Sequence, residues 1–303
     1  MNNRKILVTG ATGFIGKSLV SMLSKQGCQQ LVLSRQLQNN STSKNIHYLL
    51  CDLSSIDTQK KYIKKFQPDV IIHLGWQGIP DFSHKMCQLN LNNTINLIDI
   101  VTELDSVKKI IVSGSCFEYD NPQDVCDEGY KTSAHNLFSW SKLSIKDYLK
   151  LVCQTKNIQW YWPRIFYVYG PHQRKQSLIP TLIDSIHAGR IPQINTPFNA
   201  NDFVYVDDVV EALNCFIDQN IESGVYNIGS GYATSIASIC EQVATMFSST
   251  IQFDWQSKKD TERTSFYADI QKITKHTGWA PKTSLSQGLK ITSEAMLETY
   301  NAN

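Results

Sequence analysis

The amino-acid sequence predicts an α/β protein, with a Rossmann doubly wound parallel sheet followed by a smaller C-terminal substrate-binding lobe. Two observations lead to this prediction. Through the first half of the 303-residue chain, short apolar runs typical of buried parallel strands alternate with amphipathic stretches of helical periodicity. The first run, residues 5–9 (KILVT), leads straight into a segment of regularly spaced glycines that opens a helix.

The elements are expected in a regular order. The apolar runs predict strands at residues 5–9, 31–33, 47–51, 70–74, 109–113 and 158–166. Helical periodicity predicts helices at residues 15–26, 57–66, 90–104 and 139–156. After Gly170-Pro171 the regular alternation of strands and helices ends. A helix with apolar positions 178, 179, 182, 183 and 186 then precedes short strands and further helices. We therefore expect an NAD(P)-binding domain at residues 1–170 and a second lobe at 171–303, with strands interleaved between them.

The composition excludes several classes of function. A net charge of +2, from 29 basic and 27 acidic residues, gives no basic surface for nucleic acid or an anionic membrane. The first residues carry no long apolar stretch, and no apolar segment is long enough to span a bilayer. The eight cysteines are dispersed without a C-x-x-C pair, which predicts reduced thiols and no metal site. We expect a cytoplasmic protein.

The glycine segment predicts a dinucleotide site. Gly10, Gly13 and Gly16 follow the first strand with the spacing G-x-x-G-x-x-G. Glycine permits a tight turn, close approach of the backbone to a pyrophosphate and close packing of helix on strand, while the helix N-terminus supplies partial positive charge. The residues expected at the cofactor here are Gly10, Thr12, Gly13, Phe14, Ile15 and Gly16.

The end of the second strand favours NADP over NAD. An NAD site usually has a carboxylate there for the ribose, whereas this chain has Ser34 and Arg35. A guanidinium can bind the 2′-phosphate that distinguishes NADP, and serine does not repel it.

These motifs resemble the extended short-chain dehydrogenase/reductase superfamily, in particular its sugar-nucleotide epimerases, dehydratases and 4-ketoreductases. The resemblance covers nearly the whole chain: TGATGFIG at 9–16, IHLGW at 72–76, RIFYVYGP at 164–171, DFVYVDDVVEA at 202–212, YNIGSG at 226–231 and GWAPKTSLSQGL at 278–289. It implies further cofactor contacts from Asp52, Leu53, Leu74, Gly75, Trp76, Asn90, Ser113, Lys142 and Phe166.

The resemblance also implies a Ser/Thr–Tyr–Lys triad. Ser115 in SGSCFEY matches the hydroxyl residue and Lys142 matches the lysine, but the tyrosine position, four residues before the lysine, holds Phe138. In this family the lysine binds the nicotinamide ribose and lowers the tyrosine pKa, the phenol moves the proton, and the serine holds the carbonyl oxygen. Phenylalanine keeps the shape of the phenol and lacks its proton.

Three interpretations of Phe138 are open. The chain is a Tyr→Phe variant of an enzyme, or its acid has moved to Tyr119, Tyr167 or Cys116, or it binds a cofactor without catalysing a reaction. Removing a general acid typically costs on the order of 10²- to 10⁴-fold in rate.

The residues after Ser115 narrow the reaction that the resemblance implies. A 4,6-dehydratase needs an Asp-Glu pair where this chain has Cys116-Phe117, and reductases that also epimerise carbons 3 and 5 place a cysteine at Phe117. With Ser34 and Arg35, we expect NADPH-dependent reduction of the C4 ketone of a nucleotide-linked 4-keto-6-deoxyhexose, in bacterial deoxysugar and surface polysaccharide synthesis. The alternatives are an NAD-dependent sugar-nucleotide 4-epimerase and a catalytically dead NADP-binding protein.

A nucleotide-diphosphate sugar is the expected partner, and a homodimer the expected assembly. The resemblance assigns substrate contacts to Ser115, Cys116, Phe117, Tyr167, Asn201 and Arg263. Arg263 matches a late arginine that binds the diphosphate. A second family arginine is Asn201 here, which removes one positive charge from that site.

Overall fold

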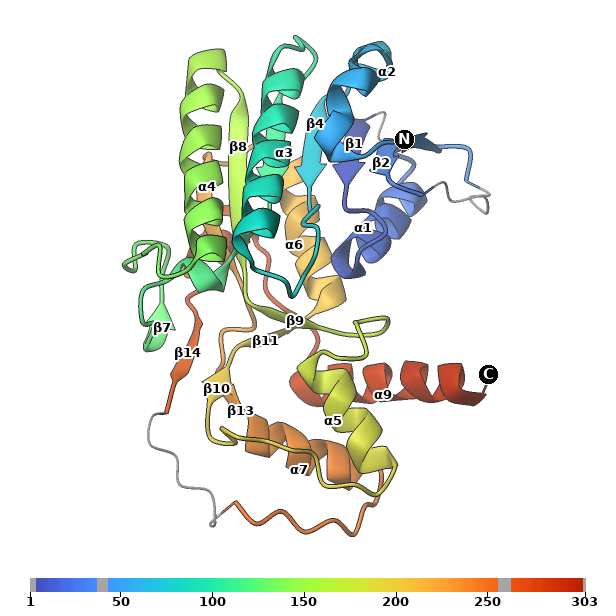
Figure 1. Ribbon diagram of the computed structural model, residues 1–303, viewed down its shortest axis with the longest axis vertical. Coiled ribbons are helices and arrows are strands. Elements are labelled where there is room, and N and C mark those ends of the chain that lie inside the picture. Colours follow the sequence, from blue (N-terminus) through green and yellow to red (C-terminus); the bar gives the residue numbers. More distant parts are fainter. Residues whose placement is uncertain (1–3, 37–42, 256–262, 302–303) are drawn as a thin grey trace. The chain divides into compact units, whose positions relative to one another are not determined.

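The computed structural model describes residues 4–36, 43–255 and 263–301, and Figure 1 shows its helices and strands. The chain forms two compact units. Unit 1 comprises Met1–Asp120, Lys131–Arg164 and Val210–Tyr226, and unit 2 comprises Asn121–Tyr130, Ile165–Val209 and Asn227–Asn303. This division differs from a single boundary at residue 170, because the chain leaves unit 1 for one short segment and returns to it for another.

Unit 1 is built on a sheet with the strand order β12-β8-β5-β4-β1-β2-β3. Its strands are β1 (Lys5–Thr9), β2 (Gln29–Ser34), β3 (Ile46–Leu50), β4 (Val70–His73), β5 (Lys109–Val112), β8 (Gln159–Ile165) and β12 (Gly224–Ile228), and β6 (Gly114–Ser115) pairs with β8. The pairs from β3 through β8 are parallel, and β1 lies between β2 and β4. This order reverses direction at β1, as in a doubly wound sheet, so the predicted fold class is confirmed.

The helices of this part of the chain are α1 (Phe14–Lys25), η1 (Leu53–Gln59), α2 (Lys60–Phe66), α3 (His84–Thr102), η2 (Cys116–Glu118), α4 (Leu137–Lys156) and α6 (Val206–Asp218). The predicted start of the third helix at residue 90 is wrong. Helix α3 begins at His84, because the side chain of Ser83 accepts a hydrogen bond from the Met86 amide and caps the helix earlier. The segment predicted as one helix at 57–66 is a 3₁₀ turn followed by α2.

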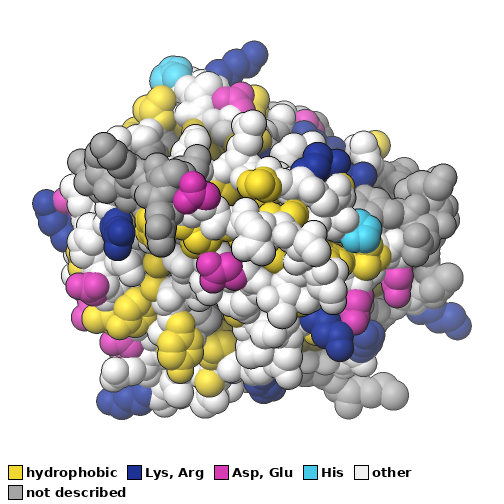
Figure 2. All heavy atoms as spheres, turned by 90° about the horizontal axis from the view of Figure 1, so that it is seen from below, with side chains coloured by type: hydrophobic (Ala, Val, Ile, Leu, Met, Phe, Trp, Pro, Cys, Tyr) yellow, Lys and Arg dark blue, Asp and Glu magenta, His cyan; other side chains and the backbone are white. Residues whose placement is uncertain are grey.

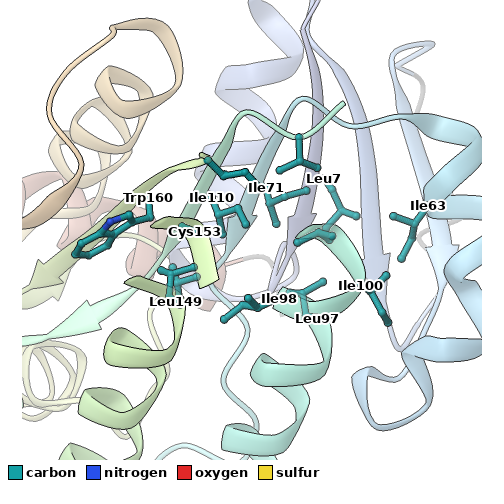
Figure 3. Close-up of a cluster of buried hydrophobic side chains, with 14 of the residues drawn as sticks. Leu7, Ile63, Ile71, Leu97, Ile98, Ile100, Ile110, Leu149, Cys153 and Trp160 are labelled. Carbon is teal, nitrogen blue, oxygen red and sulfur yellow. The ribbon is translucent and has the colours of Figure 1, made fainter. Parts of the chain in front are cut away.

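A hydrophobic core of unit 1 lies between one face of the sheet and helices α3 and α4. Figure 3 shows Leu7, Ile71 and Ile110 pointing from the strands toward Leu97 and Ile98 of α3. Leu149 and Cys153 of α4 belong to the same cluster, and α3 and α4 run side by side in Figure 1. Burial of these apolar side chains fixes the carboxyl ends of the strands, where the polar candidates of the site lie.

Unit 2 contains two small sheets. One has the order β13 (Thr234–Ser235), β10 (Ala200–Asn201), β14 (Ser265–Ala268) and β7 (Asp124–Cys126), and in the other β11 (Phe203–Tyr205) pairs in parallel with β9 (Tyr167–Tyr169). Its remaining helices are α5 (Leu178–His187), where a helix is predicted, α7 (Ile236–Met246), α8 (Gln271–Thr277) and α9 (Leu285–Asn301). The buried Asp202 carboxylate accepts bonds from the Gly231 and Ala268 amides, both at 3.0 Å, and so joins the YNIGSG segment to β14.

The surface carries charges of both signs. On the face drawn in Figure 2, basic and acidic side chains are interspersed among apolar and uncharged ones. Within residues 4–36, 43–255 and 263–301, no helix combines the length and apolarity needed to cross a membrane. Over those same ranges, no group of three or more His, Cys, Asp or Glu side chains is arranged to hold a metal ion. The eight cysteines are thiols, and seven of them are buried.

Candidate functional site

A cavity of about 220 Å³ opens in unit 1 beside the glycine segment, at the carboxyl ends of β1, β2 and β4. Its lining residues are Thr9, Gly10, Thr12, Gly13, Leu33, Ser34, Arg35, Cys51, Asp52, Leu53, Leu74, Gly75, Trp76, Gln77, Asn90 and Asn93. Ligands of open α/β sheets bind at this edge, next to the strand where the order reverses.

The glycine segment has the backbone geometry that an anion site requires. Gly10 has a φ of +73°, and a Cβ atom there would lie 2.6 Å from the backbone nitrogen of Gly75. A Cβ atom on Gly16 would lie 2.1 Å from the Gly10 carbonyl oxygen, so the helix packs directly on the turn. Gly13 caps α1 without a side-chain hydrogen bond in the described structure, and the first turn has no acidic residue. The amides of that turn therefore fit the pyrophosphate of a dinucleotide.

Many of the predicted cofactor residues come together in this cavity, namely Gly10, Thr12, Gly13, Ser34, Arg35, Asp52, Leu53, Leu74, Gly75, Trp76 and Asn90. Phe14, Ile15 and Gly16 form the first turn of α1. Phe166 belongs to unit 2, where its ring lies 5.9 Å from that of Phe266. Sequence reasoning missed Thr9, Leu33, Cys51, Gln77 and Asn93, although three of these lie at strand ends, where a signal was available.

His73, at the end of β4, supports the cavity wall in its neutral form. The Thr94 hydroxyl donates to the Asn90 carbonyl at 2.8 Å, so its oxygen accepts from His73 Nε2 at 3.0 Å. The other ring nitrogen, Nδ1, then accepts from the Thr9 hydroxyl at 2.6 Å. Burial, with a smaller contribution from Lys142, lowers the His73 pKa to about 3. The ring is therefore an uncharged structural link between β1, β4 and α3.

Helix α4 places Phe138 and Lys142 on one side, one turn apart. The Asn136 side chain accepts from the Ser139 amide at 2.8 Å, and the Ser139 hydroxyl lies 3.1 Å from the Asn136 amide, which forms a capping box. Phe138 therefore stands in the first turn. Ser115 caps the 3₁₀ turn η2 and accepts a bond from the Phe117 amide at 3.2 Å.

The Phe138 ring is enclosed by other aromatic rings. Its centroid lies 4.7 Å from that of Phe82, 5.0 Å from that of Trp76 and 6.3 Å from that of Phe117. Only 9% of Phe138 is exposed, whereas 45% of Phe117 is exposed. These rings come from separate segments of unit 1 and form an aromatic cluster (Trp76, Phe82, Phe117 and Phe138) around the position where the resemblance expects a phenol.

Lys142 is buried against this aromatic cluster. Its Nζ donates to the Ser113 carbonyl at 2.8 Å and lies 4.4 Å from the centroid of the Trp76 ring. Burial lowers the Lys142 pKa to about 8, although the negative charge of Glu118 opposes the shift. Lysines with such pKa values can gain and lose a proton near neutral pH.

A buried ion pair supports the segment that carries Ser115. The Glu118 carboxylate accepts bonds from the Ser115 amide at 2.8 Å and from Trp162 Nε1 at 2.9 Å. Arg164 Nε donates to the same carboxylate at 2.8 Å, and both side chains are almost fully buried. No sequence pattern predicts this pair, because Arg164 lies on β8, far from Glu118 along the chain.

The residues proposed as substitute proton donors each have contacts of their own in the described structure. Tyr119 is buried, with the Arg164 guanidinium 4.7 Å above its ring. Cys116 is buried, whereas its neighbour Phe117 is 45% exposed. Tyr167 belongs to unit 2, where its ring centroid lies 5.7 Å from that of Phe203.

The other predicted substrate residues also belong to unit 2. Asn201 is half-buried on β10, which pairs in parallel with β14 so that Ala200 lies opposite Ser265. Arg263 is exposed just before β14, and its guanidinium lies 4.7 Å from the centroid of the Phe198 ring. Asn201 and Arg263 therefore stand on adjacent segments of the same small sheet.

Comparison with known proteins identifies the family. Residues 6–229, which include the glycine segment, Ser115 and Lys142, match the model of the NAD dependent epimerase/dehydratase family. The chain belongs to this family. The predicted resemblance is thus confirmed, and the relatives are sugar-nucleotide epimerases and dehydratases.

Individual relatives of this epimerase/dehydratase chain are distant but match over nearly its whole length. It is 24% identical over 325 residues to a UDP-glucose 4-epimerase of Pisum sativum, covering 93% of this chain and 92% of the relative. It is 26% identical over 312 residues to an ADP-L-glycero-D-manno-heptose-6-epimerase of Brachyspira hyodysenteriae, covering 96% and 97%. The fold is similar to that of UDP-glucuronic acid 4-epimerase from Bacillus cereus in complex with NAD, with a TM-score of 0.84, 23% identity and 98% and 99% coverage.

Proposed function

We propose that this family member exchanges hydride at carbon 4 of a nucleotide-linked sugar and acts as a 4-epimerase. The proposal depends on the position of Trp76. This residue lines the cavity beside the glycine segment, and its ring lies 4.4 Å from Lys142 Nζ. The lysine and the dinucleotide cavity therefore adjoin within unit 1. Relatives named as 4-epimerases support this reaction over the others in the family.

The residues of the chain have separate tasks in this reaction. A bound nicotinamide supplies reversible hydride transfer. The first turn of α1 and the Gly10 turn bind the pyrophosphate, and an N–H group of the Lys142 side chain binds the adjacent ribose. Ser115 Oγ holds the oxygen at carbon 4 of the sugar. The aromatic cluster excludes water from the reacting carbon, which strengthens the polar contacts made there.

A second candidate is NADPH-dependent reduction of a nucleotide-linked 4-keto-6-deoxyhexose. One observation favours it: Ser34 and Arg35 line the cavity where an NAD site usually has a carboxylate. A reductase consumes one reduced cofactor in each turnover, whereas an epimerase returns the hydride and leaves the cofactor unchanged.

Measuring the net consumption of cofactor together with the sugar products tests the proposed function and distinguishes the 4-epimerase from the reductase. The purified protein is incubated with NAD or NADPH and with UDP-, dTDP-, GDP- or CDP-linked hexoses or their 4-keto-6-deoxy derivatives, and products are identified by NMR. A 4-epimerase yields the C4 epimer without net change in cofactor absorbance. Stoichiometric oxidation of NADPH by a 4-keto sugar supports the reductase. Cofactor binding with no change in any sugar nucleotide would contradict both.

Arg35 should determine the preference between cofactors. We expect NADPH to bind more tightly than NADH, and Arg35→Ala to remove most of the difference, because a guanidinium–phosphate hydrogen bond contributes about 1.5–3 kcal/mol. Calorimetric titration of both cofactors measures this. The control is Lys25→Ala, which also removes one positive charge but lies in the last turn of α1. It should leave the preference for NADPH over NADH unchanged. Equal affinities of the parent protein for NADPH and NADH would contradict the proposal that Arg35 selects NADP.

Arg263 should bind the diphosphate of the sugar nucleotide. Because Asn201 replaces a second arginine, Arg263→Ala should weaken binding of the preferred nucleoside diphosphate by about 1.5–3 kcal/mol, the range for hydrogen bonds to charged groups. Cofactor affinity should not change, since Arg263 is not among the residues that line the cavity beside the glycine segment. Titration with UDP, GDP, CDP and dTDP measures the effect, with Arg190→Ala as an exposed arginine control from unit 2. Unchanged affinity in the Arg263 variant would show that it does not contact the diphosphate.

A further inference from the structure

Phe138 leaves the proposed reaction without the phenol that its family uses to move a proton. The ring at this position has no ionisable atom and is surrounded by Trp76, Phe82 and Phe117. In the same unit, the Cys116 and Tyr119 side chains are buried, and the Tyr119 ring packs against the Arg164 guanidinium. A different group must therefore take the proton from the hydroxyl at carbon 4 and return it.

We infer that Lys142 itself carries this proton, in place of the missing tyrosine; the inference rests on the proposed function. An ammonium has three N–H donors. Among the described residues, Lys142 Nζ makes one hydrogen bond, at 2.8 Å to the Ser113 carbonyl. Two donors remain for the cofactor ribose and for the sugar. The Trp76 ring holds the amine beside the cavity wall, at the place where both ligands are expected.

The charges around Lys142 permit both of its protonation states near neutral pH. Glu118 favours the ammonium, but its charge is offset by the ion pair with Arg164 at 2.8 Å. His73, whose pKa burial and the charge of Lys142 lower to about 3, is neutral in this range. Burial then disfavours the ammonium and brings the Lys142 pKa to about 8. A general base works best with a pKa near the operating pH.

The proton and electron movements balance without a further reactant. In the oxidation half-reaction the C4–H bond of the sugar breaks, and a bound, oxidised nicotinamide would supply the acceptor for the hydrogen and both electrons of that bond. The O–H bond at this carbon also breaks, its electron pair forms the C=O bond, and the proton passes to the neutral amine of Lys142. In the return half-reaction the ketone regains hydride at its opposite face and a proton from the ammonium. Cofactor and lysine both end in their starting states.

The test compares Lys142→Arg with the parent protein. Arginine keeps the cation and the donors but does not release a proton in this pH range. We expect cofactor affinity within a few fold of the parent and a loss of 4-epimerisation on the order of 10²- to 10⁴-fold. Lys150→Arg, on the exposed side of α4, is the control and should retain full activity. In the background of Lys142→Arg, adding Phe138→Tyr should restore part of the loss.

A second readout does not depend on turnover. NMR titration of ¹³C-labelled lysine, with the Lys142 signal assigned by its absence from Lys142→Arg, should give a midpoint near 8. The rate of sugar oxidation should rise with pH through that midpoint, because only the neutral amine accepts a proton. Suppose that the parent protein catalyses 4-epimerisation. A Lys142→Arg protein with the same activity, or a Lys142 titration midpoint at the ordinary lysine pKa, would then overturn this inference and leave the proposed function intact. A parent that binds cofactor but converts no sugar nucleotide would overturn the proposed function itself.

Discussion

Replacing Phe138 by tyrosine is expected to raise turnover with the preferred nucleotide sugar by at least about tenfold. General acid–base catalysis by a positioned side chain contributes about 10²- to 10⁴-fold, and part of that is already supplied if Lys142 carries the proton. The phenol would enter one turn before Lys142, whose ammonium lies 5.8 Å from the Phe138 centroid and would lower the tyrosine pKa. Cofactor affinity should stay nearly unchanged, because Phe138 does not line the cavity.

The matched control for this variant is Phe117→Tyr. It adds the same hydroxyl to a neighbouring ring of the aromatic cluster, but on η2 and without the one-turn spacing to the lysine. Steady-state rates and cofactor titrations are compared for the parent and both variants. A Phe138→Tyr protein no faster than the parent, or a Phe117→Tyr protein equally accelerated, would show that the tyrosine position has no special role in this chain.

Breaking the buried pair at Glu118 should have the largest effect on stability. Glu118→Gln keeps the shape of the side chain but removes its charge, so Arg164 becomes an uncompensated buried cation. The amide group would also face the N–H donors of Ser115 and Trp162. Removing one partner of a buried pair costs about 3–5 kcal/mol in the free energy of unfolding, even where the intact pair adds little.

Chemical denaturation of the whole protein, followed through tryptophan fluorescence, measures this loss. Asp184→Asn breaks the exposed pair with Arg190, which has the same kind of contact at 3.0 Å, and should cost no more than about 1 kcal/mol. Because Glu118 also holds the Ser115 amide, Glu118→Gln should lower turnover in the molecules that remain folded. Equal losses in the two variants would contradict the structural role assigned to the pair.

Local sequence patterns were sufficient to predict the elements around the candidate cofactor cavity. The run KILVT, the glycines and the helix after them are consecutive in the chain, so a short window contains the whole motif. The one-turn spacing of Phe138 and Lys142 was likewise local, and α4 places both on one side. The start of α3 was missed because residues 84–89 have little apolar periodicity, and the cap at Ser83 decides the boundary.

The features of the site that could not be predicted from the sequence depend on contacts between segments that are distant along the chain. The aromatic cluster joins Trp76, Phe82, Phe117 and Phe138, and no spacing along the chain predicts that their rings meet. The Glu118–Arg164 pair and the low pKa of Lys142 have the same origin, since burial is a property of the folded unit. The return of residues 210–226 to unit 1 also follows from long-range packing. The candidate residues were therefore predictable individually, while their environments were not.

The most direct measurement of the central claim follows the hydrogen at carbon 4. A nucleotide hexose labelled with deuterium at that carbon is incubated with the purified protein and unlabelled cofactor, and the products are analysed by NMR and mass spectrometry. Hydride exchange at carbon 4 through a retained cofactor predicts that the C4 epimer forms with deuterium still on that carbon. Loss of the deuterium to water during epimerisation, or the absence of any epimer with all of the nucleotide hexoses, would contradict it.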